Sequence, residues 1–144
     1  MSWSRHLQHG LAIGVLSGMA GCDSTSLPMA PSEFTRGVVL WEHANFLGNS
    51  ALLTESQVNL ANFSGPCEHD AGDSTFKDWN DCVSSVRVAP GWRAVIYRDS
   101  DYDGQSVELT ADAPNLQLVA GTCSHDGLND CVTSIKVIAP GQAF

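Results

Sequence analysis

The chain has 144 residues, of which 43% are hydrophobic and 16% are charged, a composition typical of a globular domain and unlike that of a disordered protein. Its formal net charge is -9, and the few basic residues, 7 Lys and Arg, are scattered along the chain. Because nucleic-acid binding depends on a basic stripe that neutralises phosphates, the composition argues against nucleic acid as a partner. The acidic balance suits cation binding as well as plain solubility.

The N-terminal segment, residues 1–21, is typical of an export signal. A basic start precedes the apolar run 11–20, which is too short to span a bilayer as a mature helix. Its last residues, Met19-Ala20-Gly21, resemble the bacterial lipoprotein box, which implies cleavage before Cys22 and a lipid on that cysteine. We therefore expect an exported protein, lipid-anchored to a bacterial membrane on its periplasmic or cell-surface side. The alternative is an ordinary signal peptide cut near this site, and a secreted protein.

The number of cysteines is consistent with a lipidated Cys22. The chain has five cysteines, an odd number for an exported protein. If Cys22 is acylated, an even set remains, in an oxidising compartment where disulfides persist. The remaining cysteines are Cys67, Cys82, Cys123 and Cys131.

The rest of the chain repeats itself. A polar tether at 22–36 leads into a domain at 37–140, which consists of two copies of one unit, about 37–90 and about 91–140. Repetition of this kind indicates two supersecondary units that bury a common core.

Two short motifs carry the repeat. The first, aromatic-x4-aromatic-x-Gly, occurs at Trp41–Gly48 and again at Tyr97–Gly104. The second occurs at Asn80–Ser85, as Asn-Asp-Cys-Val-Ser-Ser, and at Asn129–Ser134, as Asn-Asp-Cys-Val-Thr-Ser. The first copy is longer, with an insertion within 71–78.

Each unit is predicted to consist of short strands. Apolar and polar residues alternate in 85–88 and again in 134–137. Gly48 and Gly104 close tight hairpins, where only glycine adopts positive φ at low cost. No stretch after residue 36 has a convincing helical period. We therefore expect an all-β domain in which the two units pair as a β-sandwich.

The two motifs, in this order and twice over, resemble the Greek-key signature of the βγ-crystallin superfamily in its microbial calcium-binding form. The resemblance covers about 37–138, and it implies a sandwich of two Greek-key motifs with two four-stranded antiparallel sheets. It also implies that the two Asn-Asp loops lie side by side and share about two calcium ions. The alternative is that the Asn-Asp pairs are only turn formers and that the sites are lost, as in vertebrate lens members.

Calcium takes six to eight hard oxygen ligands, and one short loop cannot easily supply them. The resemblance implies ligands of three kinds: hydroxyls, side-chain carboxylates or amides, and backbone carbonyls. The hydroxyls are those of Ser84 and Thr133; the side chains are Asn80, Asp81, Asn129 and Asp130; the carbonyls are those of Cys82 and Cys131, with hairpin carbonyls near Ala44 and Ser100. We expect Ser85 and Ser134 to stabilise the fold through local hydrogen bonds to the backbone.

Two readings of the cysteines are open. The pairing that respects the repeat is Cys67 with Cys82 and Cys123 with Cys131. The alternative is a zinc site of Cys67, His69, Cys123 and His125, but thiolate ligands need reducing conditions and export argues against them.

The sequence favours a binding protein over an enzyme. No nucleophile elbow, metal triad or phosphate loop accompanies its serines and histidines. One interpretation is a calcium-stabilised structural or surface module. The other is a secreted protease inhibitor or adhesion protein with a protein partner still to be identified, since members of this fold include a bacterial metalloproteinase inhibitor. For that role, the insertion with Phe76 and the neighbouring Trp79 is the candidate exposed apolar loop.

Overall fold

The computed structural model describes residues 34–68, 77–121 and 127–143. These residues form eight β-strands and three short 3₁₀ helices, so the predicted all-β class is confirmed. None of the described residues belongs to a helix that is long and apolar enough to cross a membrane. The predicted signal segment, with the lipidation site Cys22, lies outside the described residues.

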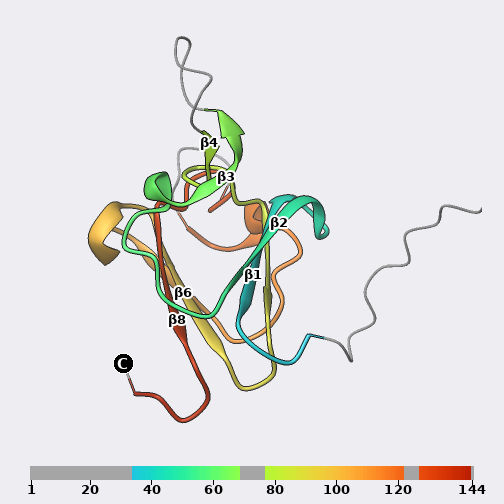
Figure 1. The fold of residues 1–144 in the computed structure, drawn as a ribbon, viewed down its shortest axis with the longest axis vertical. Helices are drawn as coiled ribbons and strands as arrows, with labels where there is room; N and C mark the ends of the chain where they lie inside the picture. The colour runs from blue at the N-terminus through green and yellow to red at the C-terminus, as the bar shows by residue number, and fades with distance from the viewer. Residues whose placement is uncertain (1–33, 69–76, 122–126, 144) are drawn as a thin grey trace, which may run out of the picture.

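Two antiparallel sheets face each other, one from each half of the chain (Figure 1). The first has the strand order β2-β1-β5, with β2 at Leu47–Leu53, β1 at Val38–His43 and β5 at Ser85–Val88. The second has the order β7-β6-β8, with β7 at Ser106–Leu109, β6 at Arg93–Tyr97 and β8 at Ser134–Ile138.

Each sheet gains its fourth member from the other half of the chain. Gln57, from the first half, exchanges two backbone hydrogen bonds with Ile135 of β8, at 2.8 and 2.9 Å. Ala113, from the second half, does the same with Val86 of β5, at 2.8 and 2.9 Å. This exchange confirms the predicted pair of Greek-key motifs and interlocks them, so each half completes the sheet of the other.

The core lies between the two sheets. Val38 and Leu40 of β1, Ile96 of β6 and Ile135 of β8 are fully buried, in accordance with the alternation expected of strands with one inward face. Full burial of such a side chain stabilises a fold by about 1.5–3 kcal/mol. These residues belong to one continuous cluster that includes side chains of both sheets.

The 3₁₀ helices repeat between the two halves. Those at Leu60–Asn62 (η1) and Leu116–Leu118 (η3) begin after Asn59 and Asn115, whose side-chain oxygens each accept a backbone N–H at 2.9 Å. The third, η2, lies at Ser100–Tyr102, in the second hairpin.

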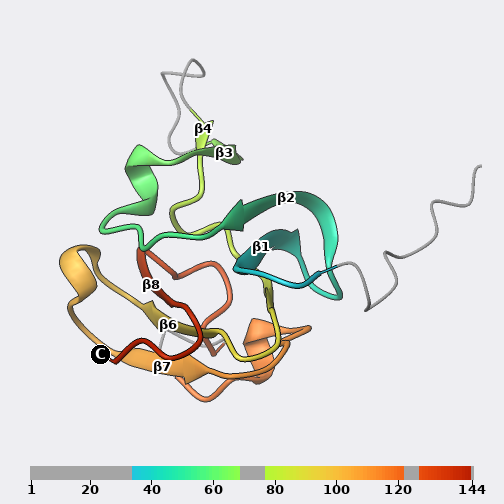
Figure 2. The same cartoon turned by 60° about the horizontal axis from the view of Figure 1, so that its bottom comes forward.

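The first half carries an additional two-stranded ribbon, β3 (Ser64–Glu68) with β4 (Lys77–Asp78), which projects from one end of the sandwich (Figures 1 and 2). Residues 69–76, with Phe76 and most of the predicted insertion, lie outside the described residues. Trp79 corrects one expectation, because it is only 2% exposed. Its backbone N–H donates to the carbonyls of Leu60 and Phe63, and its side chain packs in the core cluster.

Candidate metal centre

The two Asn-Asp loops lie side by side at one end of the sandwich. Asp81 N–H donates to the carbonyl of Val132 at 3.2 Å, and Asp130 N–H donates to the carbonyl of Val83 at 3.3 Å. This reciprocal pair relates the loops by an approximate two-fold axis and brings together residues that are far apart in sequence.

Each loop turns at a residue whose backbone has the left-handed conformation. Asp81 has φ of 46° and Asp130 has φ of 49°, a conformation that costs most side chains about 1–2 kcal/mol but that Asp tolerates better than others. Two residues later, Val83 and Val132 are buried in the core. The turn therefore sends the apolar residue inward while the Asp carboxylate stays at the surface.

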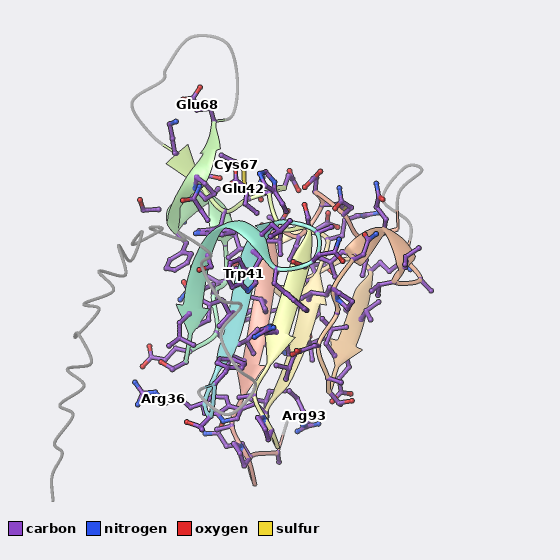
Figure 3. All side chains as sticks on the ribbon, turned by 90° about the vertical axis from the view of Figure 1, so that its right-hand side faces the viewer. Arg36, Trp41, Glu42, Cys67, Glu68 and Arg93 are labelled. Carbon is purple, nitrogen blue, oxygen red and sulfur yellow. A yellow bond between two sulfur atoms is a disulfide. The ribbon has the colours of Figure 1, made fainter. Side chains whose placement is uncertain are left out.

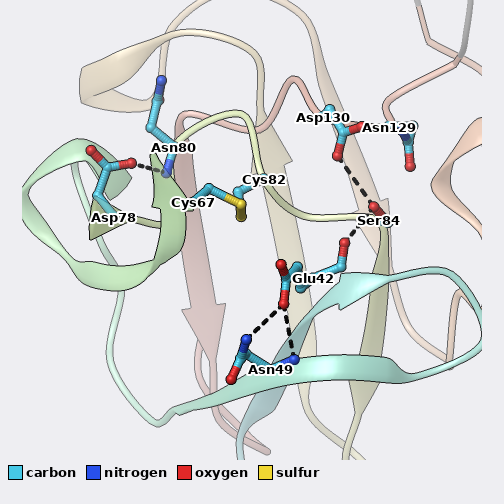
Figure 4. The surroundings of a disulfide bond; sticks show 9 residues. All are labelled: Glu42, Asn49, Cys67, Asp78, Asn80, Cys82, Ser84, Asn129 and Asp130. Carbon is cyan, nitrogen blue, oxygen red and sulfur yellow. Dashed lines mark hydrogen bonds between the residues drawn. A yellow bond between two sulfur atoms is a disulfide. The ribbon is translucent and has the colours of Figure 1, made fainter. Parts of the chain in front are cut away.

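Oxygens from three parts of the chain converge at Ser84. Its hydroxyl lies 2.7 Å from the carbonyl oxygen of Glu42 and 3.2 Å from Oδ1 of Asp130 (Figure 4). Glu42 belongs to β1, Ser84 to the first loop and Asp130 to the second. A hydroxyl has one hydrogen and cannot serve both acceptors fully, so this cluster has more acceptor oxygens than hydrogens to share among them.

The carbonyl expected to bind calcium near Ala44 stays a prediction, and the hairpin carbonyl that lies against the Ser84 hydroxyl is that of Glu42. The strand places it there, because Ser84 N–H donates to the carbonyl of Trp41 at 3.0 Å and so aligns the loop with the end of β1. The residue that follows the first aromatic of the hairpin motif thus supplies the oxygen. No sequence signal marks it, since any residue type carries a backbone carbonyl.

The second loop has the same framework. Thr133 N–H donates to the carbonyl of Tyr97 at 3.0 Å, as Ser84 N–H does to that of Trp41. By this correspondence Arg98, which follows Tyr97, is the counterpart of Glu42, and the expected carbonyl near Ser100 stays a prediction. Thr133 and Asp81 are the counterparts of Ser84 and Asp130.

The two asparagines orient their neighbours. Asn80 Nδ2 donates to Oδ2 of Asp81 at 2.8 Å, and Asn129 Nδ2 donates to Oδ2 of Asp130. Each amide therefore restrains the carboxylate beside it, and direct ligation by the two asparagines stays a prediction. The side-chain oxygen Oδ1 of Asn80 is buried and accepts no hydrogen bond from the described residues.

The hydroxyls of Ser85 and Ser134 hydrogen-bond to the backbone of the two hairpins. Ser85 Oγ donates to the carbonyl of His43 at 2.7 Å and accepts the N–H of Phe46 at 3.0 Å. Ser134 Oγ makes the same pair of bonds with Asp99 and Tyr102, at 2.6 and 3.1 Å. Both serines have the predicted structural role, but their partners are distant in sequence and not local.

Glu42 also contributes a carboxylate that the sequence did not single out. Its Oε2 accepts the side-chain amide of Asn49 at 2.7 Å and the backbone N–H of Asn49 at 3.1 Å. These hydrogen bonds, the side-chain one first, hold the pKa of Glu42 below its ordinary value. Figure 3 places Glu42 at the same end of the molecule as Cys67 and Glu68, opposite Arg36 and Arg93.

Several of these groups line one hollow, which is rich in carboxylate oxygens. Its lining residues are Glu42, His43, Cys67, Glu68, Asp81, Cys82, Ser84 and Asp130. Within the described residues, no group of three or more His, Cys, Asp or Glu side chains could hold a metal ion. The oxygens that converge at Ser84 are instead of mixed kinds, which are the hard donors that calcium takes.

Cys67 and Cys82 form a disulfide with Cα atoms 6.0 Å apart. Cys67 therefore has no thiolate for the zinc site, whose other members, His69, Cys123 and His125, lie outside the described residues. Cys131 is also disulfide-bonded. Because Cys67 and Cys82 pair with each other, the partner of Cys131 lies outside the described residues too, and its pairing with Cys123 stays a prediction.

The chain is similar to known proteins in both structure and sequence. A βγ-crystallin domain from Flavobacterium johnsoniae superposes with a TM-score of 0.53 and 29% identity, over 74% of this chain and 98% of that domain. Spherulin-3A of Physarum polycephalum is 30% identical over 119 residues, which is 83% of this chain and 94% of the relative. The family model for peptidase inhibitor family I36 matches residues 38–110. The chain belongs to peptidase inhibitor family I36 and has the βγ-crystallin fold.

Another relative of this I36 member matches a shorter stretch of the chain. A development-specific protein S homolog from Myxococcus xanthus is 37% identical over 60 residues, which is 42% of this chain and 29% of that protein. The predicted βγ-crystallin membership is thus confirmed.

Proposed function

We propose that this I36 member is a calcium-binding βγ-crystallin module, in which calcium bridges the two Asn-Asp loops. The observation that carries the proposal is the position of the Ser84 hydroxyl, within reach of both the Glu42 carbonyl and the Asp130 carboxylate. A divalent cation among these oxygens would replace an imperfectly shared hydrogen bond, with the hydroxyl keeping its proton, and would neutralise the carboxylate.

Two ions would each take oxygens from both motifs. The first would be held by the Glu42 carbonyl, the Ser84 hydroxyl and the Asp130 carboxylate. The second would be held by the Arg98 carbonyl, the Thr133 hydroxyl and the Asp81 carboxylate. With few carboxylates per site, we expect modest affinity, with Kd of roughly 10⁻⁶ to 10⁻⁴ M.

The role of the ion would be structural. Asp81 and Asp130 come from different motifs, so an ion bound to either site ties the two halves together and binds only the folded chain. An ion at a hundredfold excess over its Kd then raises the free energy of unfolding by about 2.7 kcal/mol. Calcium would rigidify the end of the sandwich from which the β3–β4 ribbon projects.

We further propose that the module works outside the cytoplasm, anchored through lipid on Cys22. The support is the export-type segment 1–21 and the lipoprotein-like residues that precede Cys22. Mass spectrometry of the protein expressed in a bacterium should find an acylated N-terminal fragment that begins at Cys22. An unmodified Cys22 thiol, or cleavage elsewhere, would refute the anchor.

Isothermal titration of the chelator-treated full chain with calcium tests the calcium proposal. We expect two bound calcium ions per chain. Magnesium at the same concentration is the control for non-specific cation binding to an acidic protein. A calcium signal no larger than the magnesium signal would reject the proposed function.

A second candidate function, protease inhibition, is favoured by the family match over 38–110, which spans β1 to β7. The test is a titration of the purified chain against a metalloproteinase and a serine protease with a peptide substrate. Inhibition that saturates at a one-to-one ratio would support this function. Proteases that keep full activity, or that degrade the chain as an ordinary substrate, would count against it.

A further inference from the structure

We propose that the Cys67–Cys82 disulfide positions the first calcium loop, so that the calcium affinity of this loop depends on whether the two cysteines are oxidised. This inference rests on the proposed function, because it concerns the regulation of the same site. It assigns Cys67 and Cys82 as positioning residues rather than as ligands.

The disulfide is attached within the loop itself. Cys82 directly follows Asp81, lies two residues before Ser84, and is only 2% exposed. Cys67 lies on β3 and lines the same hollow as Ser84 and Asp130 (Figure 4). The bond therefore joins the base of the ribbon to the middle of the segment that supplies the ligands.

Residues 79–84 contain no strand, and hydrogen bonds anchor the segment at both ends, where Trp79 N–H donates to Leu60 and Ser84 N–H donates to Trp41. Between these ends, Asp81 N–H donates to the second loop at 3.2 Å, and the φ of Asp81, 46°, is a conformation that few side chains favour. Opening the disulfide removes a covalent restraint from the next residue, Cys82. We therefore expect Asp81 and Ser84 to lose part of their preorganisation, which weakens binding because ordering the loop must then accompany binding.

The second loop repeats the arrangement. Cys131 follows Asp130 as Cys82 follows Asp81, and Cys131 is also disulfide-bonded. A cross-link that served only to shorten the unfolded chain would not have to end at this position of both loops. Its recurrence beside the carboxylate favours a role in shaping the site.

Reduction needs a donor of two electrons and two protons, which a dithiol supplies. The Cys67–Cys82 bond breaks, each sulfur gains a proton and an electron, and the dithiol closes into a cyclic disulfide. Linkage is reciprocal: if oxidation raises calcium affinity by some factor, saturating calcium favours the oxidised form by the same factor. We expect a factor on the order of tenfold, within the usual range of such couplings.

The experiment measures both sides of this linkage on the full chain. Calcium Kd is measured by titration for the oxidised wild type and for Cys67→Ser/Cys82→Ser, at a temperature where circular dichroism shows both folded. The expected result is an overall calcium affinity about tenfold weaker in the variant, since the first loop gives Ser84 to one ion and Asp81 to the other. Val137→Ala, a buried β8 position, is the control for general destabilisation and should keep the wild-type Kd.

The reciprocal measurement needs no variant. Wild-type protein is equilibrated in dithiol redox buffers with calcium or chelator, and the Cys67 and Cys82 peptides are quantified after alkylation. The redox midpoint should move by about 30 mV toward the oxidised form with calcium, the equivalent of tenfold for two electrons. If the oxidised protein binds calcium but the midpoint is the same with calcium and chelator, this inference alone is wrong. If the oxidised protein binds no calcium, the proposed function is wrong, and this inference is wrong as well.

Discussion

The hydroxyl of Ser84 lies 3.2 Å from a carboxylate oxygen of Asp130, a residue of the other Greek-key motif. The two loops therefore meet at a point where one motif supplies the hydroxyl and the other supplies the charge. A cation at this point would contact both motifs at once, and its binding would be coupled to the interlocked fold that Gln57 and Ala113 complete.

Replacing the hydroxyl residues should remove the ions one at a time. Ser84→Arg and Thr133→Arg each place a cation where calcium would bind, and a guanidinium can donate no oxygen. Isothermal titration should show one ion in place of two in each single variant. Because each ion takes a carboxylate from the opposite loop, the remaining site should weaken as well, and the double variant should bind none. A double variant that still binds two ions would contradict the assignment of these ligands.

Ser85→Ala is the matched control for Ser84. The hydroxyl of Ser85 is fully buried and bonded to His43 and Phe46 of the hairpin, so its removal leaves two backbone groups without that partner. We expect a loss of about 1–3 kcal/mol in the free energy of unfolding with the calcium stoichiometry unchanged. Chemical denaturation and titration of the same sample measure both. The distinction between the two serines fails if Ser85→Ala keeps its stability and loses an ion.

Asn49→Ala should raise the pKa of Glu42 toward its ordinary value of 4.5. The side-chain donor disappears while the backbone N–H of residue 49 remains, so part of the depression should persist. A carboxylate with a depressed pKa stabilises the fold above its unfolded pKa, and this contribution is lost as the pH falls through the folded pKa. The wild type should therefore exceed the variant in stability above about pH 5, and the difference should shrink below it.

The side-chain carbon signal of Glu42, followed by nuclear magnetic resonance from neutral to acidic pH, measures this pKa in both proteins. Glu68, whose pKa is lowered by Lys77, is the internal reference, because it does not contact Asn49 and should titrate identically in both. An unchanged Glu42 pKa in the variant would mean that Asn49 is not the cause of the depression.

Peptide mapping without reduction should find Cys67 joined to Cys82 and Cys131 joined to Cys123. The first bond is present in the structure, and the second follows from the repeat, since the loop cysteines hold equivalent positions. In the chain-entropy description, a disulfide that closes a loop of this size raises the free energy of unfolding by about 2.5–3 kcal/mol. Bonds between the two motifs, such as Cys67 with Cys123, would contradict the local pairing, and four free thiols with bound zinc would restore the metal-ligand alternative.

The sequence was informative where the spacing of side chains is fixed by the fold. The loops at Asn80 and Asn129 could be predicted to meet because their repeated residues resemble the βγ-crystallin signature, which implies two such loops side by side. The position of the Glu42 carbonyl beside Ser84 could not, because a backbone oxygen leaves no mark on the residue type. The strand exchange was equally hidden, since a single bridge at Gln57 or Ala113 has no periodic pattern.

Trp79 shows a different limit. It was expected near an exposed apolar loop, because a large aromatic beside an insertion often marks a binding surface. The structure buries it, since the chain after β4 turns back to η1 and the N–H of Trp79 donates to Leu60. Its environment depends on a contact with a residue 19 positions earlier, which no local pattern of the sequence reveals.

The most direct test of calcium as a structural ligand is the melting temperature of the oxidised wild type with millimolar calcium and with chelator. We predict a rise on the order of 10 °C with calcium, which corresponds to about 2.7 kcal/mol for a domain of this size. The Ser84→Arg/Thr133→Arg variant should melt at one temperature in both solutions. If the wild type also melts at the same temperature with calcium and with chelator, the calcium function is wrong.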